Sequence, residues 1–292
     1  MSAGNLKLVV ALLALAPLTV FADKSVDERW DINADATISI ENIAGEIVIE
    51  GWDKKEARLT GELGDSVDEL EISATSSRLQ IEVLNRNQRN IDDTDLKLMI
   101  PYGASIDASA VSANIDISGM NNERITASSV SGDVDVDASS QRVSVESVSG
   151  NVSFEGETDR ISAESVSGDI DMSGISGQID ANTVSGELEM QAGMIESAKL
   201  ETVSGNLKVT GEVADNGKLT AESMSGDVSI YLPSSQSGLF KAQTFSGDIS
   251  SDFGSVRNVD HGPGSHLKHV SGDSGAEVRV GSFSGNIKLK HD

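Results

Sequence analysis

A four-residue motif, Val-Ser-Gly-Asp or a close variant, recurs through the second half of the chain at nearly constant spacing. Its glycines are Gly132, Gly150, Gly168, Gly186, Gly205, Gly226, Gly247 and Gly285. Successive glycines are 18, 18, 18, 19, 21, 21 and 38 residues apart. A period near 20 residues with β-type composition is typical of a solenoid, in which one small unit stacks on copies of itself.

Apolar and polar residues alternate on both sides of each motif. In the third repeat, the segments 161–163 and 170–172 each have period two, which predicts a strand with one face inward. The apolar phase changes between Ser165 and Val166, so we expect a bend there. Val166 and Gly168 would then point inward, and the glycine would occupy a turn too tight for a Cβ atom. This interpretation predicts a buried apolar spine made of Val130, Val148, Val166, Val184, Val203, Met224, Phe245 and Phe283, stacked in sequence order.

Two architectures fit this pattern. In a parallel β-helix, an 18-residue coil supplies roughly 60 Å of extended chain, and equivalent residues stack about 4.8 Å apart. In an antiparallel meander, Ser-Gly would close a hairpin with the glycine at positive φ. Near-identical repeats favour stacking. We therefore predict an all-β fold: a single-stranded parallel β-helix of about nine rungs of 18–21 residues over 105–292, with a loop insertion at 253–275.

The N-terminal part of the mature chain, residues 23–104, departs from the repeat. Ile43–Ile47 resembles one degenerate rung, and Val111–Ile115 resembles another with alanine in place of glycine. Between them, 51–100 contains longer alternating strands. We predict a small antiparallel β cap over 23–104, because the open end of a parallel stack is an aggregation hazard. Lys288, Lys290 and His291 would protect the other end.

The first 22 residues predict a secretory signal peptide. Lys7 is the only charge before the apolar run Leu8–Phe21, and Val20–Ala22 offers a small-residue cleavage site. The alternative is a buried N-terminal helix. No later segment is apolar enough to span a membrane. The sequence therefore predicts an exported protein, in the periplasm or outside the cell.

The chain is strongly acidic, with 47 Asp and Glu against 22 Lys and Arg and a net charge of −25. This balance argues against nucleic acid and against anionic lipid surfaces as partners. The residue after each glycine is acidic or Asn: Asp133, Asn151, Asp169, Glu187, Asn206, Asp227, Asp248 and Asn286. Such a column is either a row of calcium ligands or a solvated acidic face. No calcium-loop motif is present, so we assign no cofactor and expect only weak stabilisation by divalent cations.

Two other clusters invite a functional interpretation. Hydroxyl pairs such as Ser165 and Ser167 recur before each glycine, and we expect hydrogen bonds at the corners rather than an ice-binding array. His261, His266 and His269 lie in the 253–275 insertion, where they could hold zinc, but their spacing matches no standard site. That insertion is the predicted recognition loop.

The sequence offers no catalytic site. Acid pairs such as Asp169 and Asp171 recur on several repeats, whereas a catalytic pair would stand apart from the repeat. No nucleophile motif, phosphate loop or cofactor fingerprint is present. We therefore assign no catalytic, cofactor-binding or metal residue.

Several segments together resemble a bacterial family known as putative adhesins. They are the signal peptide, Ile38–Ile47, Glu50–Asp53, Met99–Ala104, the serial Val-Ser-Gly-Asp motifs and Phe283–Ile287. The resemblance implies an exported β-helix-like domain and supplies no catalytic residues. The predicted function is a non-enzymatic envelope scaffold or binding surface whose partner is an envelope protein or a glycan. The alternatives are a surface adhesin that binds glycan or protein, and a polysaccharide-active enzyme.

Overall fold

The computed structural model describes residues 18–20, 25–85, 91–258, 264–273 and 275–292, and these residues form strands and turns without a helix. The strands are β1 (Leu18–Val20), β2 (Ser25–Asp31), β3 (Thr37–Trp52), β4 (Glu56–Glu62), β5 (Glu69–Ala74), β6 (Arg78–Leu84), β7 (Thr94–Pro101), β8 (Ser105–Ser129), β9 (Val134–Ser147), β10 (Val152–Glu155), β11 (Thr158–Ser165), β12 (Ile170–Thr183), β13 (Leu188–Ser204), β14 (Leu207–Ser225), β15 (Val228–Leu232), β16 (Gly238–Ser246), β17 (Ile249–Ser251), β18 (Arg257–Asn258), β19 (Ser265–Ser271), β20 (Glu277–Ser284) and β21 (Ile287–His291).

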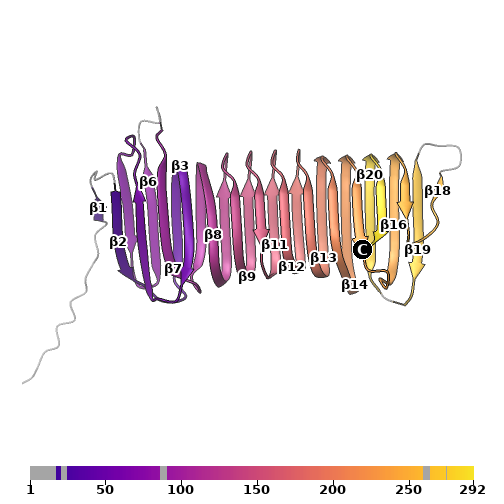
Figure 1. Ribbon diagram of the computed structural model, residues 1–292, viewed down its shortest axis with the longest axis horizontal. Coiled ribbons are helices and arrows are strands. Elements are labelled where there is room, and N and C mark those ends of the chain that lie inside the picture. Colours follow the sequence, from indigo (N-terminus) through magenta and orange to yellow (C-terminus); the bar gives the residue numbers. More distant parts are fainter. Residues whose placement is uncertain (1–17, 21–24, 86–90, 259–263, 274) are drawn as a thin grey trace, which may run out of the picture.

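The repeats pair in parallel, one period apart. Val152 pairs with Val134 on one side and with Ile170 on the other, in parallel register. Ile161 likewise lies between Val143 and Ile179. Figure 1 shows the resulting row of strands along the long axis of the molecule. The antiparallel meander is therefore wrong for these repeats, and we call each stacked period a rung.

Inward residues of both strands of each rung form the core. In the third repeat, Ile161, Ala163, Ile170 and Met172 are all buried, as period-two alternation predicts. Equivalent residues on successive rungs join them in one apolar cluster that extends from Val26 to Leu289. Burial of this column, together with the backbone ladders between rungs, stabilises a chain that has no cysteine.

The prediction of a buried apolar spine is wrong, because the side chains of that column point outward. Val166 is 44% exposed, whereas Ser165 is only 5% exposed and Gly168 is buried. Val166 and Ser167 both point outward, so the bend lies one residue later than the apolar phase predicted. Gly168 occupies the inward position of the corner. Only glycine fits there, because a Cβ atom would collide with the carbonyl oxygen of Gly150 on the preceding rung.

An out-of-sequence rung lies near each end of the stack. Toward the N-terminus, β3 pairs in parallel with β8 on one side and with β6 and β7 on the other. Antiparallel pairs β2–β4, β4–β7 and β5–β6 continue the sheet outward from there. The earliest rung in the sequence is thus enclosed rather than terminal.

Toward the C-terminus, β20 lies between β14 and β16 (Figure 1). On the other strand of the same rung, β21 lies between β15 and β17. Stacking in strict sequence order is therefore wrong for the last two rungs. The chain skips one position, forms β16 and β17, returns through β18 and β19, and fills the vacant position last. This detour accounts for the 38-residue spacing before the final glycine.

The same detour changes two expectations for this end. Lys288, Lys290 and His291 lie on β21 inside the stack, so their predicted role as guards of the open end is wrong. The stretch predicted as a loop insertion, 253–275, contains β18 and β19, and β19 covers β16 in antiparallel register. Residues 259–263 and 274 of this stretch lie outside the described part of the chain.

Candidate binding groove

The first of the two outward residues at each corner belongs to a column of exposed apolar side chains, which we call the apolar ladder. Its members, in spatial order, are Val111, Val130, Val148, Val166, Val184, Val203, Met224, Phe283 and Phe245. Exposure reaches 61% at Met224. The rings of Phe245 and Phe283 stack with centroids 4.9 Å apart and planes 3° apart. The apolar column that the sequence indicated therefore exists, but on the surface.

A hydroxyl beneath the ladder fixes the corner. Ser165 Oγ accepts the Gly168 N–H at 2.9 Å and donates to the Gly150 carbonyl at 3.3 Å. Ser129 and Ser147 make the same two bonds on the two preceding repeats. The expected hydrogen bonding at the corners is confirmed for the first hydroxyl of these pairs, whereas the second, such as Ser167, is exposed. Because the serine turns inward to serve these bonds, the next residue must turn outward.

A groove of about 800 Å³ follows the ladder across the rungs. The ladder forms one wall, and buried hydroxyl residues form the floor. The other wall is the column two residues before the ladder, which contains Ser128, Glu146, Glu164, Asn182, Glu201 and Glu222. The groove is thus apolar on one side and acidic on the other.

In the described part of the chain, two of the four glutamates of the acidic wall have no cation beside them, whereas Glu222 interacts with the charges of Lys199 and Arg279. Within the described residues, Glu146 and Glu164 take part in no ion pair, whereas Glu201 pairs with Lys199 at 2.7 Å. On the floor, Thr202 Oγ1 is buried without a hydrogen-bond partner in the described structure. Unpaired carboxylates beside exposed apolar groups can attract cations that also carry apolar surface.

The column after the glycines lies beyond the exposed serine column that includes Ser167, and it has a structural role. Asn151 N–H donates to Asp133 Oδ1 at 2.7 Å, and Asp169 N–H donates to Asn151 Oδ1 at 3.0 Å. Glu187 N–H continues the series by donating to Asp169 Oδ1 at 2.7 Å. Each side chain therefore caps the backbone of the next rung. Nowhere in the described residues do three or more His, Asp or Glu side chains come together as a metal site would require.

The family model of Toastrack, designated DUF4097, matches residues 28–212 and 194–290. The chain belongs to the Toastrack family. Its resemblance to the putative adhesins is thereby confirmed at the level of a family of unknown function. No curated protein matches the chain significantly.

Solved structures similar to this Toastrack chain include a putative adhesin from Bacteroides fragilis, at 12% identity and a TM-score of 0.47, covering 92% of this chain and 98% of that one. A putative adhesin from Parabacteroides merdae has 12% identity and a TM-score of 0.44, covering 91% and 96%. A putative lipid binding protein from Parabacteroides distasonis has 16% identity and a TM-score of 0.45, covering 91% and 97%.

A second acidic region of the Toastrack chain lies on the strands after the corners. Burial raises the pKa of the Asp135 carboxyl, and the charges of Asp116 and Asp133 raise it further. Burial likewise raises the pKa of Asp171, with smaller contributions from its neighbouring carboxylates. These raised values follow first from burial of the carboxyl groups and then from the like charges beside them.

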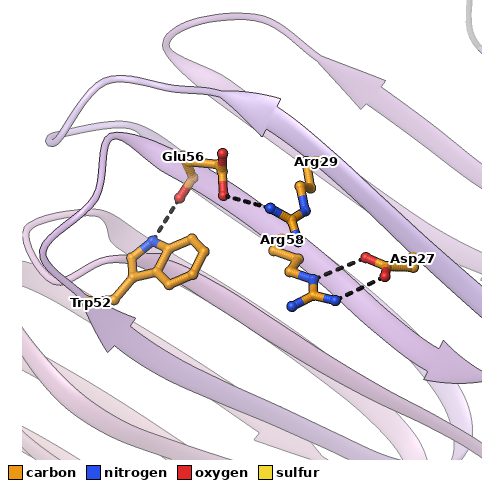
Figure 2. Close-up of polar contacts among 5 residues, drawn as sticks. All are labelled: Asp27, Arg29, Trp52, Glu56 and Arg58. Atoms are coloured by element: carbon orange, nitrogen blue, oxygen red, sulfur yellow. Dashed lines mark hydrogen bonds and ion pairs between the residues drawn. The ribbon is translucent and has the colours of Figure 1, made fainter.

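A polar cluster holds the N-terminal sheet together (Figure 2). Arg58 donates to both carboxylate oxygens of Asp27, at 2.9 and 2.8 Å, and this pairing lowers the pKa of Asp27. Arg29 lies 3.8 Å from Glu56, whose carbonyl accepts the Trp52 indole N–H at 2.7 Å. These contacts join β2, β3 and β4, so we assign the cluster to the stability of the N-terminal sheet.

The histidines of the predicted recognition loop separate into different settings. His266 and His269 lie on β19, and His261 falls outside the described residues. His291, from β21, makes an edge contact with Phe253, with ring centroids 4.7 Å apart.

The described part of the chain contains no helix with the length and apolar character of a membrane span.

Proposed function

We propose that this Toastrack chain is a non-enzymatic binding protein of the cell envelope, and that its binding surface is the groove along the apolar ladder. The unbroken row of exposed apolar side chains carries this proposal. A soluble protein rarely keeps a contiguous apolar patch of this kind unless a partner covers it. The chain has a net charge of −25, so we would expect polar residues at these positions if no partner covered them.

We also propose how the chain is organised. Residues 1–22 would be removed as a signal peptide, leaving an antiparallel cap at 23–104 and a single-stranded parallel β-helix of about nine rungs at 105–292. The parallel register between repeats supports the β-helix, and the antiparallel pairs β2–β4 and β5–β6 support the cap, although β3 within 23–104 adds a parallel rung. The mature protein would reside in the periplasm, or at the cell surface if it is an adhesin.

The composition of the groove supports binding rather than catalysis. Its lining combines carboxylates with Ser, Thr, Asn and apolar residues, and contains no His, Lys or Arg. A polysaccharide-cleaving enzyme needs two carboxyl groups in different environments, one held protonated. Glu146 and Glu164 are instead equivalent residues of successive repeats. Of the two expected partners, a protein suits the groove better than a glycan does, because the ladder offers apolar area and few hydrogen-bonding groups.

The proposal can be tested by placing a photo-crosslinking amino acid at Val166 in the cells that produce the protein. The matched control carries the same amino acid at Asp137, an exposed residue outside the groove. We expect one defined envelope protein to crosslink at Val166 alone, and Val148→Ser with Val184→Ser to abolish that adduct. No adduct at Val166, or the same adducts at both positions, would contradict the proposal. Protease shaving of intact cells, with fractionation, tests the location.

A further inference from the structure

The geometry points to one class of occupant for the groove: we propose a basic amphipathic α-helix, supplied by another protein and lying along the stacking axis. The inference rests on the proposed binding function and deepens it by naming the partner's chemistry. It follows from the spacing of the ladder, the hydrogen bonds of its backbone and the charge of the acidic wall beside it.

The spacing of the ladder is closer to the spacing on a helix face than to that along a strand. Successive rungs place equivalent outward side chains about 4.8 Å apart. Residues three and four apart on one face of an α-helix are about 4.5–6 Å apart along its axis. Alternate side chains on an extended strand are about 6.8 Å apart, so a strand laid along the axis loses register within two rungs.

The backbone of the corners excludes a partner that binds as an added strand. Strand addition needs free N–H and C=O groups at a sheet edge. At the corners those groups are already engaged between rungs: Ser167 N–H donates to the Val148 carbonyl at 3.0 Å, and Ser185 N–H donates to the Val166 carbonyl at 2.9 Å. A helix satisfies its own backbone internally and presents only side chains to the ladder.

The acidic wall beside the ladder sets the charge of the helix. Glu146 and Glu164 lie there without a cation among the described residues. On the other side of the ladder an exposed serine column that includes Ser167 comes first, and the Asp and Asn column lies beyond it. A helix whose apolar stripe is flanked by Lys or Arg complements this surface. A second copy of this chain would bring the same carboxylates into opposition, and an anionic membrane would also be repelled.

The length and the shape of the ladder constrain the helix further. From Val130 to Phe245 the ladder spans seven intervals, or about 34 Å at the usual strand spacing. An α-helix of about 22 residues has that length. Ladder side chains grow from Val to Met224 and Phe283, so the helix should carry large apolar residues over the valines and small ones over the phenylalanines.

The test uses the mature full-length protein and a fluorescein-labelled 22-residue peptide. The peptide has Leu at i, i+3, i+4 and i+7 spacing with Lys on both flanks. One control peptide has the same composition with the spacing scrambled, and a second carries Glu in place of Lys. Fluorescence anisotropy gives Kd. We expect the first peptide to bind at least about tenfold more tightly than either control, a difference of about 1.4 kcal/mol.

Matched variants localise the binding. Val148→Ser, Val166→Ser and Val184→Ser together should weaken it about tenfold, whereas Val270→Ser, an exposed valine on β19, should leave it within about twofold. Glu146→Gln with Glu164→Gln should weaken it about threefold or more and reduce its dependence on salt. Asp137→Asn with Glu155→Gln makes the same charge change outside the groove and should have little effect.

Equal binding of the scrambled peptide, or an unchanged Kd in the triple serine variant, would overturn the inference, because attraction would then be to net charge alone. The proposed function fails separately, if Val166 crosslinks to nothing. A Val166 adduct that maps to an acidic or extended segment of the partner would keep the binding function and refute the helix. Preferential binding to phosphatidylglycerol vesicles would also refute it.

Discussion

The backbone amide of Asp169 donates a 3.0 Å hydrogen bond to Oδ1 of Asn151, the equivalent residue one rung earlier. The same bond recurs between Asp227 N–H and Asn206 Oδ1, again at 3.0 Å. Asp and Asn share the acceptor oxygen that this bond needs, which explains why the position tolerates both. Each Asn also separates carboxylates that would otherwise repel each other across about 4.8 Å.

Replacing Asn151 by alanine should lower the free energy of unfolding by about 1 kcal/mol, because the amide of Asp169 loses its acceptor. Ser149→Ala, which truncates an exposed side chain on the same rung, should change it by less than about 0.5 kcal/mol. Urea unfolding followed by circular dichroism measures both. Equal stabilities of the two variants would show that the column does not cap the rungs.

Gly168→Ala should destabilise the protein by about 3 kcal/mol or more, since the new methyl group meets the carbonyl oxygen of Gly150 and the close stacking of rungs leaves no room for it. Ser167→Ala, at the adjacent outward position, provides the matched control. Thermal melts of the two variants check the difference. A Gly168→Ala protein as stable as the control would mean that the rungs are not packed this closely.

The pattern of the repeat predicted the parallel core well, because period-two alternation and a fixed glycine both report directly on packing. It failed at Val166, where counting apolar residues favoured an inward side chain. The correct signal was Ser165, since its hydroxyl could satisfy two backbone groups inside the corner. An exposed apolar column violates the usual rule of burial, and such violations are expected where a surface binds a partner.

The position of the last rung in the stack could not be predicted from the sequence, for a different reason. The segments β16 and β20 have the same apolar pattern, and both fit beside β14. Pattern alone therefore cannot decide which one occupies that place. Long-range features decide it, among them the antiparallel pairing of β19 with β16. The 38-residue spacing showed that something was inserted, but not where the chain returned.

An ion-pair network joins the returning rung to its neighbour and should make its attachment sensitive to acid. Hydrogen bonds from Arg279 and then Lys241 lower the pKa of Glu277 to about 2. A carboxyl whose pKa is lower in the folded state stabilises the fold above its unfolded pKa of about 4.3, and this contribution disappears as the pH falls toward 2. Glu277→Gln should therefore lower the melting temperature by a few degrees at pH 7 and by almost nothing near pH 2.

Melting curves of Glu277→Gln and the parent protein at pH 7, 4 and 2.5 measure this dependence. Glu123→Gln, which removes an exposed ion pair with Arg142 far from the returning rung, controls for general charge effects. A difference between variant and parent that stays constant with pH would show that Glu277 does not contribute through its charge.

Asp135 should show the opposite sign. Burial and the nearby charges of Asp116 and Asp133 raise its pKa, so the ionised form destabilises the folded state, and stability is gained as the pH falls through the raised value. Asp135→Asn should raise the melting temperature at pH 7 by about 1–2 °C, a small effect because the side chain is partly exposed. The gain should vanish below about pH 3.9, where the unfolded carboxyl is also protonated. A lower melting temperature at pH 7 would contradict this assignment.

The order of the last rungs can be tested by disulfide formation, because the chain contains no cysteine of its own. Ser229 pairs with Lys288, and Lys288 pairs with Ser250, so Ser229 and Ser250 lie two strands apart. Disulfides require Cα atoms about 4.4–6.8 Å apart.

Ser229→Cys with Lys288→Cys should therefore oxidise readily, and so should Lys288→Cys with Ser250→Cys. Ser229→Cys with Ser250→Cys should stay reduced, because about 9.6 Å separates strands two positions apart. Stacking in sequence order would reverse this result by making Ser229 and Ser250 neighbours, and non-reducing gel mobility with thiol titration distinguishes the two orders.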